Sequence, residues 1–216
     1  MAAASSLPVG AANAAIYVSA TSGPQAAVPA GGILVNFDDP LPWGVTLSGS
    51  YSIASGSVHN VNAEPWLDKT KYLFAPTAGD SSGNATIMFA DALGYNGLDS
   101  LTFYWGSVDQ YNTLTFLDRL GAPIASITGA VFPPANGTQT GGATNINFTA
   151  TFTNESRGLI GGVNFGSARP AYELDDFHLA TGSVPEPTTW AMMIIGFGGA
   201  GAMLRRQRRR NLLQVA

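Results

Sequence analysis

Acidic residues in two short clusters are the side chains of this sequence best suited to hold a metal ion. Asp38 and Asp39 end the stretch "NFDD", while Glu173, Asp175 and Asp176 belong to "YELDD". Carboxylate oxygens are the ligands that Ca²⁺ prefers in proteins. If the first and last strands of the domain are neighbours, these five carboxylates predict a structural calcium site. The alternative is that they are solvated strand-end carboxylates that cap turns.

Residues for acid–base or covalent catalysis are few. The two histidines are His59, in the polar segment "SGSVHNVN", and His178, which we expect to be an exposed strand residue on the same face as Asp176. There is no His-Glu-x-x-His motif and no phosphate-binding loop of the Gly-x-x-x-x-Gly-Lys type. Glycoside hydrolysis needs two carboxyls that face one substrate, whereas adjacent strand residues point to opposite faces. The sequence therefore predicts a protein that is not an enzyme, with a hydrolase as the remaining alternative.

Two tryptophans in proline-flanked loops are the candidates for binding sugars. Trp43 lies in "PLPWG" and Trp66 in "AEPWLD". Exposed flat rings stack on pyranose faces, so these two residues predict a glycan contact; the alternative is that each ring covers an edge of the core. Trp105 alternates with polar neighbours in "LTFYWGS" and is expected to be buried.

The elements that position these residues have a hydrophobic period of two. Alternating stretches are separated by Gly, Pro and Asn turns, and no amphipathic helical stretch interrupts them. The expected strands are residues 33–37, 44–53, 85–90, 98–109, 112–118, 123–129, 144–152, 159–167 and 171–180. This pattern predicts an all-β fold, an antiparallel β-sandwich with a jelly roll as the favoured topology.

Composition restricts the ligands. The chain has no cysteine, which excludes disulfides and thiolate metal sites. Up to residue 183 it has thirteen acidic and five basic residues, a net charge of −8. Nucleic-acid binding requires neutralisation of phosphates and is therefore not expected. Calcium and neutral polysaccharide are compatible with this charge.

The C-terminal tail differs in character from the rest of the chain. Residues 187–204 are eighteen consecutive uncharged residues, with Trp190 near their start. As a helix they would be about 27 Å long, close to the thickness of a bilayer core of about 30 Å. A basic cluster follows, and the positive-inside rule places it in the cytoplasm; it consists of Arg205, Arg206, Arg208, Arg209 and Arg210. The tail thus predicts a transmembrane helix at 188–204 and a cytoplasmic segment at 205–216, with a buried core helix as the alternative.

The segment "PEPTTWAMMIIGFGGAGAMLRRQRRR" resembles the PEP-CTERM sorting signal of proteobacteria, in which a Pro-Glu-Pro motif precedes a hydrophobic helix and a basic cluster. The resemblance implies cleavage by an exosortase in the inner membrane and delivery to the cell surface or extracellular matrix of a Gram-negative bacterium. The implied recognition residues are Pro185, Glu186 and Pro187, with Trp190 and Ala191 completing the subtype pattern. The stretches "LTFYWGSVDQYNTLTFLD" and "AYELDDFHLATGSVPEP" are also similar to the bodies of PEP-CTERM surface proteins, which supports the sandwich and no particular activity.

These observations divide the chain into five parts. Residues 1–27 are expected to be a signal-peptide remnant and a flexible segment, since "AANA" is typical of a signal-peptidase site; a flexible Ala-rich terminus is the alternative. Residues 28–180 form the sandwich and 181–187 a linker with the Pro-Glu-Pro motif, followed by the helix and tail. The predicted function is an exported surface or exopolysaccharide-associated protein that is not an enzyme. The alternative is a lectin-like carbohydrate-binding module with a structural calcium ion.

Overall fold

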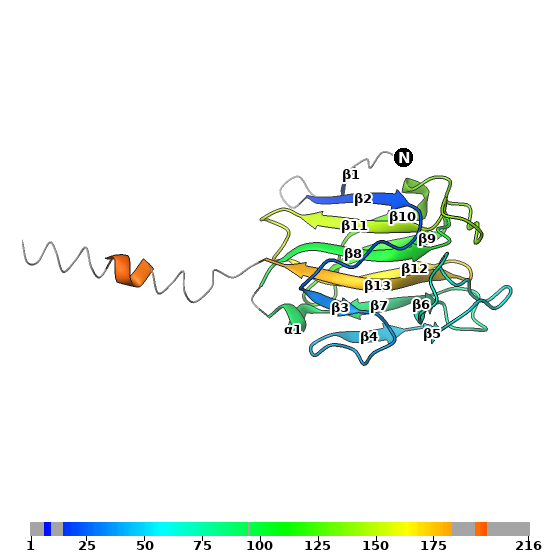
Figure 1. Cartoon of the computed structure of the whole chain (residues 1–216), viewed down its shortest axis with the longest axis horizontal. Helices are drawn as coiled ribbons and strands as arrows, with labels where there is room; N and C mark the ends of the chain where they lie inside the picture. Colours follow the sequence, from blue (N-terminus) through cyan, green and yellow to red (C-terminus); the bar gives the residue numbers. More distant parts are fainter. Residues whose placement is uncertain (1–6, 10–14, 95, 183–192, 198–216) are drawn as a thin grey trace, which may run out of the picture. The chain divides into compact units, whose positions relative to one another are not determined.

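The structure of the chain, a computed structural model, describes residues 7–9, 15–94, 96–182 and 193–197. The chain divides into two compact units, residues 1–182 and 183–216. The strands of the described residues lie in the first unit, as Figure 1 shows.

The larger sheet of the first unit has eight strands, and every pair in it is antiparallel. Strand β13, the last strand, pairs with β8 on one side and with β6 and then β3 on the other. In spatial order the strands are β1 (Leu7–Val9), β2 (Ile16–Ser22), β11 (Ile146–Phe152), β8 (Leu98–Gly106), β13 (Tyr172–Thr181), β6 (Tyr72–Ala75) and β5 (Ser52–Ala54), with β3 (Ile33–Val35) beside β13.

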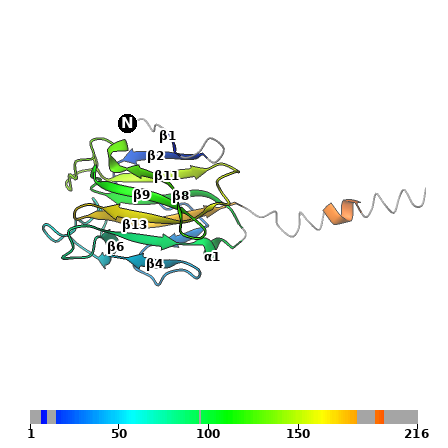
Figure 2. The same cartoon turned by 180° about the vertical axis from the view of Figure 1, so that it is seen from behind.

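The smaller sheet has five antiparallel strands. Figure 2 shows the molecule from behind, with β9 and β4 of this sheet labelled. A short helix α1 (Ala90–Leu93) follows β7, and a 3₁₀ turn η1 (Gly129–Val131) follows β10. In spatial order the strands are β10 (Pro123–Thr128), β9 (Asn112–Asp118), β12 (Ile160–Ser167), β7 (Gly83–Met88) and β4 (Thr46–Gly49).

The two sheets pack face to face around one hydrophobic core. Phe103 of the larger sheet lies 4.8 Å from Phe148, measured between ring centroids, and 5.4 Å from Phe165 of the smaller sheet. Trp105 is fully buried and stacks on Tyr172 at 4.4 Å. Because alternate residues of each strand face this core, the residues between them line the outer faces of the sandwich.

The structure confirms the mainly antiparallel β fold, and the predicted nearness of the first and last strands of residues 28–180 is present as the β3–β13 pair. Two predictions of element bounds were wrong. Residues 44–53 contain β4 and the start of β5, which lie in different sheets, with a break at Ser50 and Tyr51. The sandwich also begins before residue 28, because β2 pairs with β11 and buries Ile16 and Val18. The jelly-roll topology stays a prediction.

The predicted membrane helix falls mostly outside the described residues. Residues 193–197 form a short helical segment with exposed side chains, drawn in orange in Figure 1. Among the described residues, no helix combines the length and the apolar character that crossing a bilayer requires. The remainder of 188–204 and the arginine cluster are not described, so the transmembrane helix stays a prediction.

Candidate functional site

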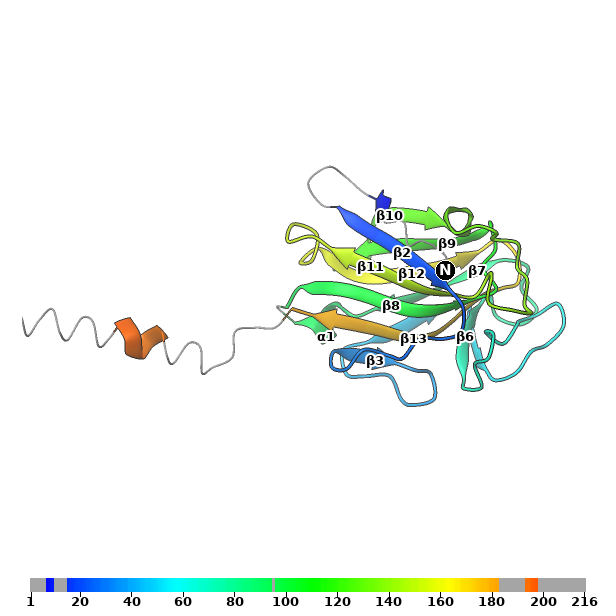
Figure 3. The same cartoon turned by 45° about the horizontal axis from the view of Figure 1, so that its top comes forward.

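A segment between β2 and β3, which we call the strap (residues 23–32), crosses the outer face of the larger sheet (Figure 3). Asn147 of β11 holds its first half through two hydrogen bonds. The Asn147 side chain donates to the carbonyl oxygen of Pro24 at 2.9 Å and accepts from the backbone N–H of Ala26 at 2.7 Å. Gln25 donates to the carboxylate of Asp176 at 2.7 Å, which ties the strap to β13.

The second half of the strap lies against His178. The ring Nε2 of His178 lies 2.5 Å from the carbonyl oxygen of Gly31, and the side chain is buried. Gly32 has a φ of +77°, and a Cβ there would lie 2.8 Å from His178 Nε2 and 2.3 Å from the carbonyl oxygen of Leu179. The strap can therefore lie this close to β13 only with glycine at position 32. His178, predicted to be exposed, is covered by the strap.

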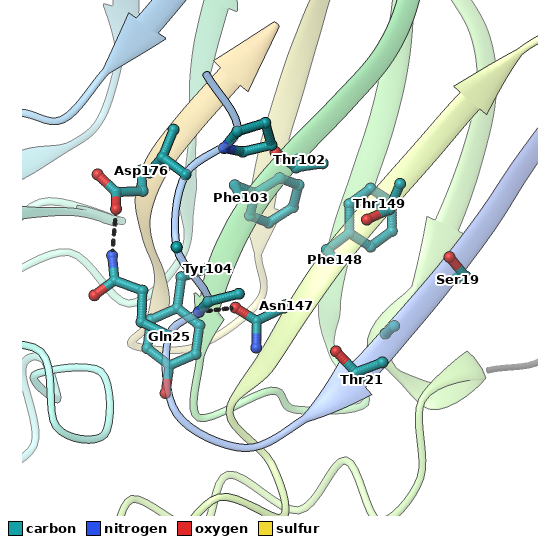
Figure 4. A pocket seen from close by; sticks show the side chains of 15 residues that line it. Ser19, Thr21, Gln25, Thr102, Phe103, Tyr104, Asn147, Phe148, Thr149 and Asp176 are labelled. Atoms are coloured by element: carbon teal, nitrogen blue, oxygen red, sulfur yellow. Dashed lines mark hydrogen bonds between the residues drawn. The ribbon is translucent and has the colours of Figure 1, made fainter. Parts of the chain in front are cut away.

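A groove of about 250 Å³ lies between the strap and the sheet (Figure 4). Its floor consists of small polar side chains on three adjacent strands. The register aligns Thr149 of β11 with Ser19 on one side and Thr102 on the other. The lining side chains that offer hydroxyl, amide or carboxylate groups are Ser19, Thr21, Gln25, Thr102, Tyr104, Asn147, Thr149 and Asp176.

A β-bulge in β13 brings both acids of the Asp175–Asp176 doublet to this side of the sheet. Asp175 is paired with Tyr104 and His178 with Thr102, so β13 has one extra residue between these positions. Asp176 has a φ of +49°, in the left-handed region. The rule that adjacent strand residues point to opposite faces does not hold at the bulge, and Asp176 lines the groove.

The buried carboxyls of Asp175 and Asp68 are joined by the side chain of Thr70. The Thr70 hydroxyl lies 2.5 Å from Asp68 Oδ1 and 2.8 Å from Asp175 Oδ2. A hydroxyl has one proton, so Thr70 cannot donate to both carboxyls. Burial raises the pKa of Asp175 to about 8. A protonated Asp175 supplies the missing donor, and Thr70 then donates to Asp68.

Glu173 is enclosed further along the same strand. Its carboxyl accepts hydrogen bonds from the backbone N–H of Ala63 at 3.0 Å and from the hydroxyl of Ser107 at 2.8 Å. Burial raises the pKa of Glu173 to about 8, because the charged form loses its hydration. The side chain joins three segments of the fold and does not line the groove.

The five carboxylates predicted to bind calcium do not gather into one site. Asp39 forms a local turn with Asn36, whose amide donates to its carboxylate at 2.8 Å, and Asp38 accepts from the backbone of Lys71 at 3.2 Å. Among the described residues, no three His, Cys, Asp or Glu side chains lie close enough together to hold a metal ion. The structure therefore does not assemble the predicted set of five carboxylates, and calcium binding stays a prediction. For Asp39, the turn-capping alternative describes the contacts.

The two candidate stacking residues lie at opposite ends of the sandwich. Trp43 is 85% exposed and borders a shallow depression formed with α1 and Arg119. Trp66 is half-buried, and its backbone N–H donates to the buried side chain of Asn145 at 2.9 Å. The structure does not bring these two rings together into one platform.

Sequence reasoning passed over one catalytic pattern and one structural residue. Residues 79–83 read Gly-Asp-Ser-Ser-Gly and match the nucleophile-elbow pattern, but both serines are exposed and a strand, not a helix, follows them. Asn145 accepts from the backbone N–H groups of Trp66 and Ser107 and donates to Gly141. A lone asparagine gives no sequence signal for such a role. His59, the other candidate base, is exposed.

The predicted recognition residues of the sorting signal lie outside the described residues. A family model of the PEP-CTERM protein-sorting motif matches residues 183–210. Comparison with curated proteins finds no match. Among solved structures, the enzymatically active domain of tailspike protein 4 of bacteriophage CBA120 is similar at 19% identity and a TM-score of 0.35, over 64% of this chain and 19% of that chain. The chain thus carries a PEP-CTERM sorting motif directly after the last strand of its β domain.

Proposed function

We propose that this chain is a surface or extracellular-matrix protein of a Gram-negative bacterium, exported and then processed at its tail by an exosortase. The observation that supports this most is the position of the sorting motif. Strand β13 ends at Thr181 and the motif begins at residue 183. Because β13 is a central strand of the larger sheet, the domain is complete just before the motif, and removal of the motif leaves its hydrogen-bonded strands intact.

The β domain acts in this proposal as a binding or structural unit and not as an enzyme. Asp176 is the carboxylate that lines the groove in the described part of the chain, and it is engaged by Gln25. Hydrolysis of a glycosidic bond uses two carboxyls about 5–10 Å apart across the substrate. In this proposal the domain associates with exopolysaccharide, since an uncharged polymer is compatible with a domain of net charge −8.

Intact-mass and localisation measurements test the proposal. The full chain, produced in cells with an exosortase, is expected at the surface without its arginine cluster. In cells without the exosortase it is expected in the membrane fraction at full length. Glu186→Ala should give the same unprocessed species even when the exosortase is present. A surface-exposed product that still carries Arg205 to Arg210 would contradict processing.

The groove supports a second candidate function, binding of a neutral glycan. Hydroxyl, amide and carboxylate groups are the partners that sugar hydroxyls need, and several of them line the groove from β2, β11, β8 and β13. This site differs from the predicted one, because Trp43 and Trp66 do not line the groove.

Affinity electrophoresis of the full chain in detergent, through gels containing a neutral glucan or galactomannan, tests glycan binding. Retardation is expected for the native chain and is expected to be lost in Thr149→Arg, which fills the groove. Thr115→Arg is the matched control, since it adds the same side chain to the outer face of the smaller sheet. Equal retardation of both variants would exclude the groove as the glycan site.

A further inference from the structure

One end of the β domain carries its two most exposed large apolar side chains. Among residues 15–94 and 96–182, Leu120 at 95% and Trp43 at 85% are the two most exposed large apolar side chains. Leu159 is 48% exposed, less than Leu67 at 61% and Val58 at 56%, which belong to the loop between β5 and β6. Leu120 lies in the β9–β10 hairpin, Trp43 in the loop before β4 and Leu159 in the loop before β12. We call these three residues the apolar rim.

The strand pairing places the three loops at the same end of the domain. Asp118, at the start of the β9–β10 hairpin, pairs with Ile160, which directly follows Leu159. Thr46, at the start of β4, pairs with Met88 at the end of β7, next to α1. Arg119 joins these two regions by donating to the carbonyl oxygen of Ala90 at 2.8 Å and to that of Gly94.

The loops that carry the apolar rim are fixed by their own contacts. Asp118 Oδ1 accepts hydrogen bonds from the backbone N–H groups of Leu120 and Ala122, both at 2.8 Å. The carboxylate is therefore hydrogen-bonded within the hairpin. Gly44, next to Trp43, has a φ of +76° and packs so closely on α1 that a Cβ would lie 2.5 Å from the nitrogen of Ala92. Exposure of these apolar side chains is therefore a property of ordered loops, which favours a contact surface.

The first unit also ends at this end of the domain. The backbone N–H of Gly182 donates to the carbonyl oxygen of Gly97 at 3.2 Å. The backbone N–H of Leu98 donates to the carbonyl oxygen of Arg157, in the loop of Leu159, at 2.9 Å. Residues 183–186 separate Gly182 from the uncharged stretch that begins at Pro187. The five residue steps from Gly182 to Pro187 span at most about 18 Å. If the stretch is inserted in a bilayer, this end of the domain is confined close to the membrane surface.

We propose that the apolar rim of Trp43, Leu120 and Leu159 inserts into the interfacial region of the bilayer while the sorting tail is still attached. Tryptophan is favoured at that depth, and leucine gains by leaving water. The contact does not depend on anionic lipid, because this end also carries Asp91, Asp99, Asp118 and Glu155 beside Arg119 and Arg157. It keeps this end of the domain at the bilayer surface until cleavage releases the domain. The proposal rests on the proposed membrane insertion of the tail.

Tryptophan quenching in phosphatidylcholine vesicles with brominated acyl chains tests the docking and the insertion separately. The full chain with Trp190→Phe retains Trp43, Trp66 and the buried Trp105. Its emission is expected to fall in brominated relative to plain vesicles. Adding Trp43→Phe should abolish the fall, while adding Trp66→Phe, at the other end of the domain, should preserve it. Leu120→Gln should reduce the quenching of Trp43 without unfolding the domain, because Leu120 is almost fully exposed.

Trp190 itself reports on the tail in a chain that carries Trp43→Phe and Trp66→Phe. Quenching of Trp190 without quenching of Trp43 would overturn the docking and leave membrane insertion standing. Quenching of Trp43 without that of Trp190 would support the docking and contradict insertion of the tail. Absence of both would overturn both.

Discussion

Glu173 makes the stability of the domain depend on pH. Its pKa is raised from 4.5 to about 8 in the folded state, so between these values the folded chain holds a proton that the unfolded chain has released. The contribution of the protonated Glu173 to the free energy of unfolding is therefore fully present below the ordinary pKa of 4.5, and it is lost as the pH rises through 8. The slope from one such group is about 1.4 kcal/mol per pH unit. Asp175, with a pKa also raised to about 8, adds a slope of the same sign.

We expect Glu173→Gln to make the free energy of unfolding less dependent on pH between 5 and 8. Glutamine reproduces the protonated acid, since its amide can accept from Ala63 and donate to Ser107. The measurement is urea unfolding of the full chain in detergent at several pH values, followed by tryptophan fluorescence. Glu155→Gln is the control, because Glu155 is on the surface and its pKa is lowered, not raised. An unchanged slope in Glu173→Gln would show that Glu173 is ionised in the folded chain.

The residues of β13 also show what could be predicted from the sequence at this scale. The acids of "YELDD" are recognisable as unusual for a strand, and their placement on the last strand is confirmed. Their environment was not predictable, because it depends on the bulge at Asp176 and on the loop with Asp68 and Thr70, 105 residues away from Asp175 in sequence. An alternating pattern contains no sign of one extra residue in a strand.

At the scale of elements, strands with strong alternation were predictable and those with continuous or weak patterns were not. β8, β9, β11 and β13 were expected close to their observed bounds. β6 was missed because all four of its residues are buried, so "YLFA" does not alternate. β2 was missed because an Ala- and Ser-rich segment resembles a terminus, although its pairing with β11 continues over seven residues.

The strap is the element on which the groove depends, and its sequence explains why it was not foreseen. "GPQAAVPAGG" has no periodicity and contains two prolines, which is typical of a linker. Its position comes from partners distant in sequence: Asn147 holds Pro24 and Ala26, and Asp176 holds Gln25. Because those partners lie on strands β11 and β13, the groove exists only after the larger sheet has formed.

At the scale of the whole molecule, charge is distributed unevenly along the chain. Removal of an N-terminal segment can therefore be distinguished from removal of the C-terminal tail. The full chain has a net charge of −4, but residues 1–183 carry −8, Glu186 adds one negative charge, and the five tail arginines compensate. The first 27 residues contain no charged side chain. Loss of an N-terminal segment therefore changes the mass and leaves the side-chain charge unaltered, whereas loss of the tail changes both.

We therefore expect the mature protein to focus at a more acidic pH than the full chain, with a smaller mass, on two-dimensional gels of cells that contain the exosortase. Cells without the enzyme should show the less acidic species of net charge −4. The control is the chain with Arg205, Arg206 and Arg208 changed to Gln, whose unprocessed form should focus close to the mature protein while keeping its full mass. A mature protein that is smaller but unshifted in charge would mean that only the N-terminal region had been removed. The arginine cluster would then remain attached to the exported domain, and exosortase processing at residues 183–210 would be refuted.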